Sequence, residues 1–206
     1  MSLIKEPVSK RLFDLILSVF GLLVSSPLWI IISLSIYIFD GWPVLFSQER
    51  CGKQGRVFTI IKFRTMINPV KSNSVHRVID LDDDFRITRT GKFIRVTAMD
   101  ELPVLINILK GDMSFVGPKP LPYLIEDNDA VRYKNIAQVP GYEIRSKVRP
   151  GLTGIAQVYA PKNTDHRSKF RYDSLYVQKM SFCLDIKIIL ASFWTTFSAG
   201  WEDKSI

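Results

Sequence analysis

The chain has 206 residues, a formal net charge of +8 and 47% hydrophobic residues, a length suited to one compact domain with an additional segment. A chain that is both basic and apolar is unusual among soluble proteins, and it is typical of proteins that work at a membrane surface on anionic lipids or phosphates. Nucleic-acid binding is disfavoured because no recognition motif accompanies the charge, and the lone Cys51 and Cys183 have no metal-ligand spacing.

An apolar run extends from Leu12 to Phe39 near the start of the chain. As a helix it is about 42 Å long, more than a hydrocarbon core of about 30 Å requires. Ser25-Ser26-Pro27 lies in its middle, where proline removes a helix hydrogen bond and the hydroxyls can bind freed backbone groups. Cations flank both ends, which the positive-inside rule places in the cytoplasm. A kinked spanning helix and a re-entrant hairpin, with limbs too short to span, both stay open.

The segments after this run are expected to be more polar. Val57–Ile61 predicts a short strand or a buried segment. Lys62 and Arg64 follow it, either as solvated charges or as phosphate ligands. Asp82-Asp83-Asp84 matches no calcium-loop spacing and favours a solvated loop. Asp14 and Asp40, near the ends of the apolar run, are expected at headgroup level.

Two adjacent carboxylates, Asp100 and Glu101, stand between a basic segment and an apolar helix. Apolar residues recur at helical spacing from Leu102 to Leu109, and Gly111 is a natural stop. The pair is therefore expected at a helix N-terminus, where backbone N–H groups and the helix dipole favour anions. One interpretation is a helix cap. The other is phosphoryl transfer, because the pair lies among cations and a carboxylate can attack phosphorus or hold a metal ion.

The C-terminal half contains fewer local signals. Residues 123–139 are expected to be partly helical. Arg145, Lys147 and Arg149 alternate, either as a charged strand face or as a site for a diphosphate or lipid headgroup. The apolar stretch from Phe182 to Phe197 is too short to span a membrane, and it predicts either an interfacial helix or a buried core helix.

Several ordered motifs resemble the signature of the bacterial sugar transferases, the monotopic phosphoglycosyl transferases that begin lipid-linked glycan assembly. The resemblance covers nearly the whole chain, and so many motifs in the same order are far less probable by chance than one short match. The motifs are Lys62-Phe-Arg-Thr-Met66, Arg95 with Asp100-Glu101-Leu-Pro103, Asn107–Pro120 ending in Gly-Pro-Lys-Pro, Arg149–Val158 and Tyr172–Val177.

The resemblance implies transfer of a sugar-1-phosphate from a UDP-sugar to a polyprenyl phosphate such as undecaprenyl phosphate, with release of UMP. It implies a ping-pong route that depends on Mg²⁺ and passes through a covalent phospho-sugar enzyme. By motif, Asp100 is the nucleophile, Glu101 helps to hold Mg²⁺ or activates the lipid phosphate, and both are candidate metal ligands. The candidate substrate- and phosphate-binding residues are Arg95, Lys62, Arg64, Pro118, Lys119, Pro120, Arg145 and Arg149.

The same resemblance favours the re-entrant helix, with its break at Ser26 and Pro27, over the kinked span. It implies an α+β, predominantly helical fold with little sheet and interfacial amphipathic helices, divided into a membrane helix at 1–41 and a catalytic domain at 42–206. The expected location is the bacterial inner membrane, monotopic, with the catalytic domain facing the cytoplasm. The expected partners are the UDP-sugar, polyprenyl phosphate and membrane lipids but no nucleic acid, and a homodimer is left open.

The sequence departs from the family pattern in two places. Lys119 stands where the Gly-Pro-x-Pro turn usually carries arginine, and lysine lacks the bidentate fork. Tyr159-Ala-Pro-Lys-Asn163 replaces the usual Asn-Gly-Arg-Asn, so the sugar is not inferred. Two other classes remain: a membrane-attached phosphohydrolase with water as acceptor, and a non-catalytic membrane scaffold.

Overall fold

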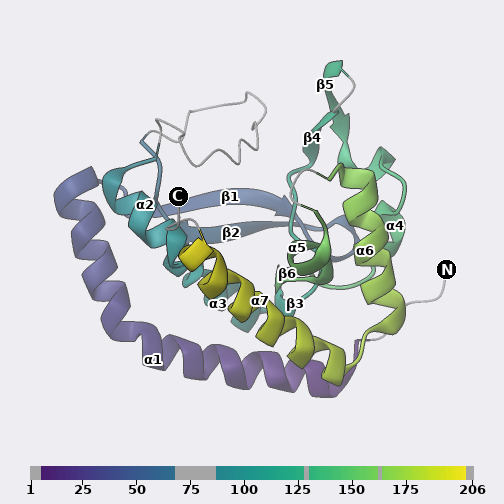
Figure 1. Cartoon of the computed structure of the whole chain (residues 1–206), viewed down its shortest axis with the longest axis horizontal. Coiled ribbons are helices and arrows are strands. Elements are labelled where there is room, and N and C mark those ends of the chain that lie inside the picture. Colours follow the sequence, from purple (N-terminus) through teal and green to yellow (C-terminus); the bar gives the residue numbers. More distant parts are fainter. Residues whose placement is uncertain (1–5, 68–86, 128–129, 162–163, 203–206) are drawn as a thin grey trace.

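The structure is a computed structural model that describes residues 6–67, 87–127, 130–161 and 164–202. Helices predominate in these ranges, and the strands form three two-stranded sheets (Figure 1). This confirms the expected predominantly helical fold with little sheet. The acidic run Asp82-Asp83-Asp84 lies outside the described residues.

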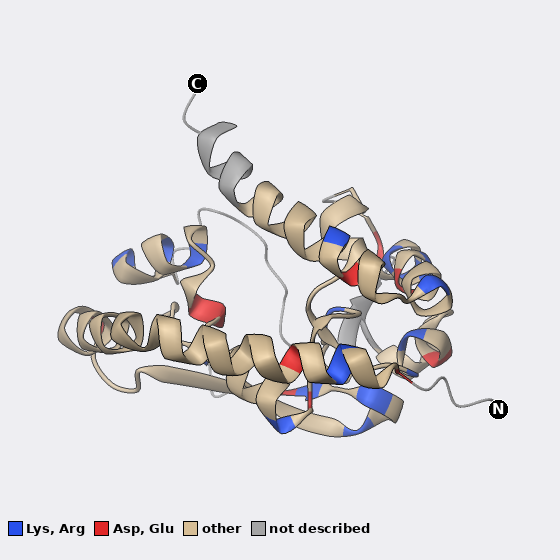
Figure 2. Cartoon of the chain, turned by 90° about the horizontal axis from the view of Figure 1, so that it is seen from below, with Lys and Arg blue, Asp and Glu red and all other residues tan. Residues whose placement is uncertain are grey.

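Helix α1 (Val8–Asp40) is one continuous helix of 33 residues, and in the described part of the chain it is the one helix long and apolar enough to cross a membrane. It runs along one edge of the molecule and bends upward at its far end (Figure 1), and its charged positions gather near its N-terminal end (Figure 2). Ser26 Oγ donates to the Leu23 carbonyl at 2.8 Å. That carbonyl is the one that Pro27, lacking an N–H, leaves unbonded. The chain therefore stays helical through Ser25-Ser26-Pro27.

The hairpin of β1 (Leu45–Cys51) and β2 (Val57–Phe63) follows, with the short 3₁₀ turn η1 (Lys53–Gly55) between them. The predicted strand is confirmed and extends to Phe63, so Lys62 lies within it. Helix α2 (Arg89–Val96), the 3₁₀ turn η2 (Met99–Glu101) and helix α3 (Val104–Lys110) come next. Ile60 of β2 packs against Val104 and Ile108 of α3, and this core holds the hairpin against the helix.

A parallel pair of short strands, β3 (Ser114–Val116) and β6 (Gly151–Thr153), joins the parts of the chain on either side of residues 117–150. Between them lie β4 (Leu124–Asp127), β5 (Ala130–Asn135), η3 (Ile136–Gln138) and α4 (Tyr142–Arg145). The prediction that residues 123–139 are partly helical is therefore mostly wrong. Most of this segment is an antiparallel hairpin, and its helical part is the single turn η3.

Three helices close the structure: α5 (Ile155–Tyr159), α6 (His166–Lys179) and α7 (Phe182–Glu202). Ile188 of α7 is buried against the core, whereas Leu190, Phe193 and Trp194 are exposed. One face of helix α7 therefore packs into the core, as predicted for a core helix, while another presents apolar side chains outward, and its interfacial location stays a prediction.

Gly151 lies where β3 and β6 approach too closely for a side chain. A Cβ placed on Gly151 would lie 2.1 Å from the Gly117 nitrogen and 2.4 Å from the Thr153 oxygen, both backbone atoms. We expect Gly151→Ala to destabilise the protein by about 3 kcal/mol, because backbone on both sides must move. The measurement is the unfolding temperature in detergent.

Gly41→Ala is the matched comparison for Gly151→Ala. Gly41 has φ +76° and ψ −171° but no atom within 4 Å of an added Cβ, so its substitution costs only backbone strain, about 1–3 kcal/mol. A Gly151→Ala protein as stable as the wild type would contradict the close approach of the two strands.

Candidate active site

Asp100 and Glu101 lie in η2, between the end of α2 and the start of α3. Ala98 has a positive φ of 54°, which turns the chain out of α2, and the Thr97 hydroxyl donates to the Phe93 carbonyl at 2.9 Å. Pro103 occupies the N-cap position of α3, where its missing N–H costs no helix bond. Gly111 ends α3 with φ 94°. The predicted position of the two carboxylates at a helix start, and the predicted stop, are confirmed.

Lys62 is the cation that the structure brings directly to the carboxylates. Its Nζ pairs with the Glu101 carboxylate and lies 4.0 Å from Asp100 Oδ2. Strand β2 makes this contact possible because the flanking Ile60 and Phe63 are buried in the core, which fixes the strand beside η2. The sequence motif that contains Lys62 thus contacts the motif that contains Asp100 and Glu101, a pair called the dyad below.

The two carboxylates differ in exposure. The Asp100 side chain is 15% exposed and the Glu101 side chain 34% exposed. Burial raises the pKa of Asp100 to about 6; the Glu101 charge acts in the same direction, while the positive charges of Lys62 and Arg95 oppose it. Asp100 is therefore a poorly hydrated carboxylate that ionises just below neutral pH, which suits a nucleophile.

The raised pKa gives a pH prediction. A carboxylate attacks only when it is deprotonated, so we expect kcat/KM for the sugar donor to fall about tenfold per pH unit below about pH 6. With an unperturbed aspartate the rate would stay the same down to the ordinary aspartate pKa of 3.8. Initial rates measured between about pH 4.5 and 8 define this acid limb of the pH profile. A rate that stays constant down to about pH 4.5 would contradict the assignment.

The remaining predicted site residues lie in other surroundings. Arg95 is exposed in the last turn of α2, near enough to affect the pKa of Asp100. Arg64 is buried, and its guanidinium donates to the Gly41 carbonyl at 2.6 Å and to the Asp40 carbonyl. Arg64 thus holds the end of α1, and its phosphate-binding role stays a prediction.

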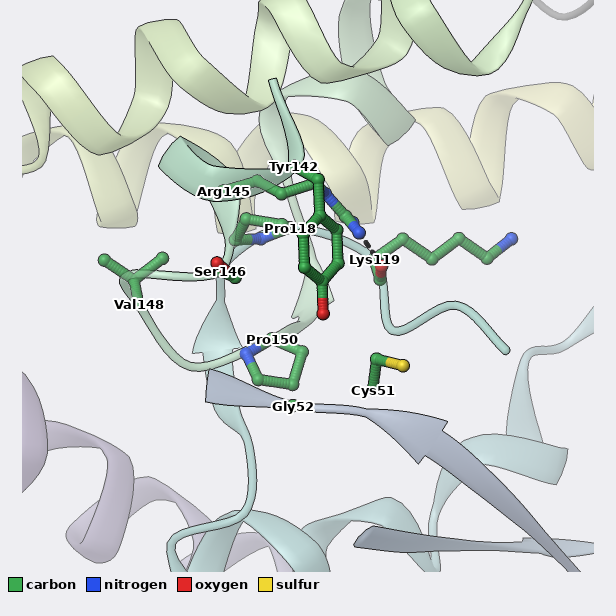
Figure 3. Close-up of a pocket in the computed structure, with 9 residues that line it drawn as sticks. All are labelled: Cys51, Gly52, Pro118, Lys119, Tyr142, Arg145, Ser146, Val148 and Pro150. Atoms are coloured by element: carbon green, nitrogen blue, oxygen red, sulfur yellow. Dashed lines mark hydrogen bonds between the residues drawn. The ribbon is translucent and has the colours of Figure 1, made fainter. Parts of the chain in front are cut away.

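A second group of predicted residues surrounds a small pocket (Figure 3). Pro118, Lys119 and Arg145 line it together with Cys51 and Tyr142. Arg145 Nε donates to Asp173 Oδ2 at 2.9 Å, and the guanidinium also donates to the Lys119 carbonyl, whereas the Lys119 side chain points away from Arg145 (Figure 3).

Two further predicted residues belong to the same region. Arg149 is buried and pairs with Glu6 at 2.6 Å. Pro120 is partly buried one residue before Leu121, whose carbonyl accepts the Cys51 N–H at 2.9 Å. The phosphate-binding roles of Arg145 and Arg149 stay predictions, because the structure gives both guanidinium groups carboxylate partners.

The two groups lie at opposite ends of the β1–β2 hairpin. Lys62 is opposite Phe46, and Cys51 at the other end is opposite Val57. Phe46 and Cys51 are five residue steps apart along β1, or about 17 Å. The predicted residues therefore form a dyad group (Lys62, Arg95, Asp100 and Glu101) and a turn group (Pro118, Lys119, Pro120, Arg145 and Arg149).

Sequence reasoning missed several charged residues that support the turn group. Lys10 and Asp14 of α1 are buried within the protein, and the expected position of Asp14 at headgroup level stays a prediction. Asp14 accepts hydrogen bonds from Ser114 and Phe115 in β3. The spacing of four residues between Lys10 and Asp14 was the available signal, since it places both on one helix face, and Glu6 lies just before that helix.

A divalent cation would fit at the dyad only with help from a substrate. Among the residues described, no group of three or more His, Cys, Asp or Glu side chains could hold a metal ion. Mg²⁺ commonly takes one or two carboxylates and completes its shell with substrate phosphates and water. Asp100 and Glu101 offer the hard oxygen donors that such a site requires.

The comparisons with known proteins agree with this arrangement. Residues 5–199 match the family model described as bacterial sugar transferase. The chain is 38% identical over 203 residues to a UDP-glucose:undecaprenyl-phosphate glucose-1-phosphate transferase of Klebsiella pneumoniae, covering 96% of this chain and 41% of that protein. It is 36% identical to the UDP-N-acetylgalactosamine-undecaprenyl-phosphate N-acetylgalactosaminephosphotransferase of Aeromonas hydrophila, covering 94% of this chain and 45% of that protein.

A shorter relative matches over most of its own length as well. The uncharacterized sugar transferase EpsL of Bacillus subtilis is 38% identical over 182 residues, covering 88% of this chain and 84% of that protein. The chain thus spans less than half of the two larger relatives and most of the smaller one. On the family match and these identities, the chain belongs to the bacterial sugar transferase family.

Proposed function

We propose that this protein transfers a sugar-1-phosphate from a UDP-sugar to a polyprenyl phosphate such as undecaprenyl phosphate, releasing UMP. The observation that carries the proposal is the partly buried Asp100, which lies beside Glu101 and Lys62 in a member of this family. The printed names of the relatives support the substrate classes, because they combine a UDP-sugar donor with undecaprenyl phosphate.

In the first half-reaction, a carboxylate oxygen of Asp100 attacks the sugar-proximal phosphorus. The new P–O bond forms as the diphosphate P–O bond breaks, and UMP leaves with the bonding electrons. In the second half-reaction, a phosphate oxygen of the polyprenyl acceptor attacks the same phosphorus and releases the Asp100 carboxylate. Asp100 is therefore the attacking group in the first half-reaction and the leaving group in the second. The donor and the acceptor react in separate steps, which is a ping-pong route.

The neighbouring residues have distinct roles in this proposal. Lys62 and Arg95 neutralise charge that develops on the phosphoryl oxygens. Glu101, with Asp100, would hold Mg²⁺, which screens the diphosphate charge when bound. Glu101 alternatively activates the incoming lipid phosphate. Lys119 supplies a cation from the Gly-Pro-Lys-Pro turn.

Helix α1 suggests how a water-soluble donor meets a lipid acceptor. Its outer face exposes apolar side chains along its whole length, among them Leu12, Phe20, Ile30 and Phe39. We propose that α1 enters the cytoplasmic leaflet of the bacterial inner membrane and returns, with its bend at Pro27, so that both ends stay on the cytoplasmic side. Exposed Phe193 and Trp194 of α7 would lie in the interface.

The first experiment tests the covalent step without an acceptor. Protein in native lipid particles is incubated with Mg²⁺ and a panel of UDP-sugars labelled at the sugar-proximal phosphate, and intact mass reports a phospho-sugar adduct. Discharge of the adduct by undecaprenyl phosphate would establish the two-step transfer and identify the sugar. Release of sugar phosphate to water, with no lipid product, would instead favour the phosphohydrolase. No adduct and no product with any sugar would overturn the proposal and favour the scaffold.

A further inference from the structure

The buried face of α1 carries charges that a simple membrane anchor does not need. Lys10 and Asp14 are spaced by four residues and share one side of the helix axis, and Glu6 lies two residues before the helix begins. Lys10 is 3% exposed and Asp14 is fully buried. Burying charged groups is costly unless each has a well-placed partner, so the partners of this face indicate what it holds.

The first set of partners is strand β3. Asp14 Oδ1 accepts from Ser114 Oγ at 3.0 Å and from the Phe115 N–H at 3.1 Å. Lys10 Nζ donates to the Val116 carbonyl at 2.9 Å. Two side chains of α1 therefore hold three consecutive residues, directly before the turn Gly117-Pro118-Lys119-Pro120.

The second set of partners lies just before the neighbouring strand, β6. The Arg149 backbone N–H and Nε donate to the two Glu6 carboxylate oxygens at 2.7 and 2.6 Å. Arg149 directly precedes Pro150 and Gly151, where β6 begins. The Gly151 N–H donates to the Pro118 carbonyl at 3.0 Å, so the start of β6 is also bonded to the Gly-Pro-Lys-Pro turn.

Helices α6 and α7 complete the arrangement from the other side. Lys10 Nζ lies 2.7 Å from Asp185 Oδ2 of α7. The Tyr176 hydroxyl of α6 lies 2.7 Å from Asp185 Oδ1 and 3.1 Å from the Val116 carbonyl. The Val116 carbonyl is thus held by groups from α1 and α6, and Asp185 fixes both groups.

We propose that Lys10 and Asp14 are positioning residues through which α1 holds the Gly-Pro-Lys-Pro turn in place for the sugar donor. This inference rests on the proposed function for its substrate. In this proposal the apolar outer face of α1 contacts lipid, while its charged inner face binds β3. Helix α1 therefore fixes the turn relative to the membrane as well as anchoring the protein.

The test uses Lys10→Met/Asp185→Leu in the full chain. Removing both charges leaves no unpaired buried ion, so the fold is expected to persist. We expect the backbone N–H groups of residues 114–117, 119 and 121 to exchange hydrogen about tenfold faster, because the charged hydrogen bond from Lys10 to the Val116 carbonyl is lost. With UDP-glucose and UDP-N-acetylgalactosamine as donors, KM is expected to rise about tenfold while kcat changes less than about threefold. Co-sedimentation with lipid vesicles and the unfolding temperature are expected to stay unchanged.

Lys187→Met is the matched control, because Lys187 is exposed on α7 two residues from Asp185. Lys187→Met is expected to keep the wild-type hydrogen-exchange rates around the turn and the wild-type KM for both donors. Unchanged exchange in the double variant would overturn the inference, as would faster exchange with an unchanged KM. If the wild type uses neither donor, the proposed function fails for these sugars, while hydrogen exchange still decides whether Lys10 holds the turn. If the double variant does not fold, Tyr176→Phe keeps both charges and is expected to speed the same exchange about threefold; no change there would also overturn the inference.

Discussion

Asp100→Asn is expected to lower sugar-phosphate transfer by at least about 10⁴-fold, the largest effect of any single substitution in this chain. Asparagine has nearly the same shape as aspartate, so the turn η2 is retained, but its amide oxygen is a poor nucleophile toward phosphorus. The measurements are lipid-linked product in a full assay and the phospho-sugar adduct by intact mass. Both signals are expected to vanish together, since one atom forms the adduct and the product depends on it.

Asp165→Asn is the control for the same chemical change. Asp165 caps helix α6 by accepting the Ser168 N–H, and asparagine caps helices equally well. Its transfer rate is expected to match that of the wild type. An Asp100→Asn protein that keeps more than about 1% of the transfer rate would show that another group attacks phosphorus.

Lys62→Met is expected to lower kcat/KM about 10²- to 10³-fold, the range typical of removing one preorganised charge from a reacting phosphoryl or acyl group. A second effect has a definite sign. The Lys62 charge lowers the pKa of Asp100, so its removal raises that pKa above about 6 and moves the acid limb of the pH profile upward. The measurement is kcat/KM across pH for the variant and the wild type.

Glu101→Gln is the matched test of that sign. The Glu101 charge raises the pKa of Asp100, so its removal is expected to move the acid limb downward, opposite to Lys62→Met. Lys92→Met removes an exposed cation from α2 and is expected to leave the limb in place. Two shifts in the same direction would contradict the electrostatic pairing of Lys62 with the dyad.

Local rules were sufficient for the elements whose conformation depends on neighbouring residues. The apolar spacing after Asp100 and the stop at Gly111 predicted α3, because helix periodicity and a left-handed cap are properties of a few adjacent residues. The Ser25-Ser26-Pro27 motif predicted that a hydroxyl binds a backbone group that proline leaves free, and Ser26 does so, although the helix continues through the expected break. Family resemblance then connected Asp100 and Glu101 to a reaction class.

The partners of the charged residues were decided by tertiary structure alone. Arg64, Arg145 and Arg149 all lie in motifs, yet their guanidinium groups bind backbone carbonyls or carboxylates from distant parts of the chain. A charge is paired by whatever group lies within a few ångströms, and sequence spacing does not report that distance. For the same reason Lys10 and Asp14, which look like charges at the edge of a membrane helix, are buried against β3. The sequence by itself therefore determined the family, the long apolar helix α1 and helix α3, whereas only the folded chain decided which cations face Asp100 and Glu101 and which hold the turns.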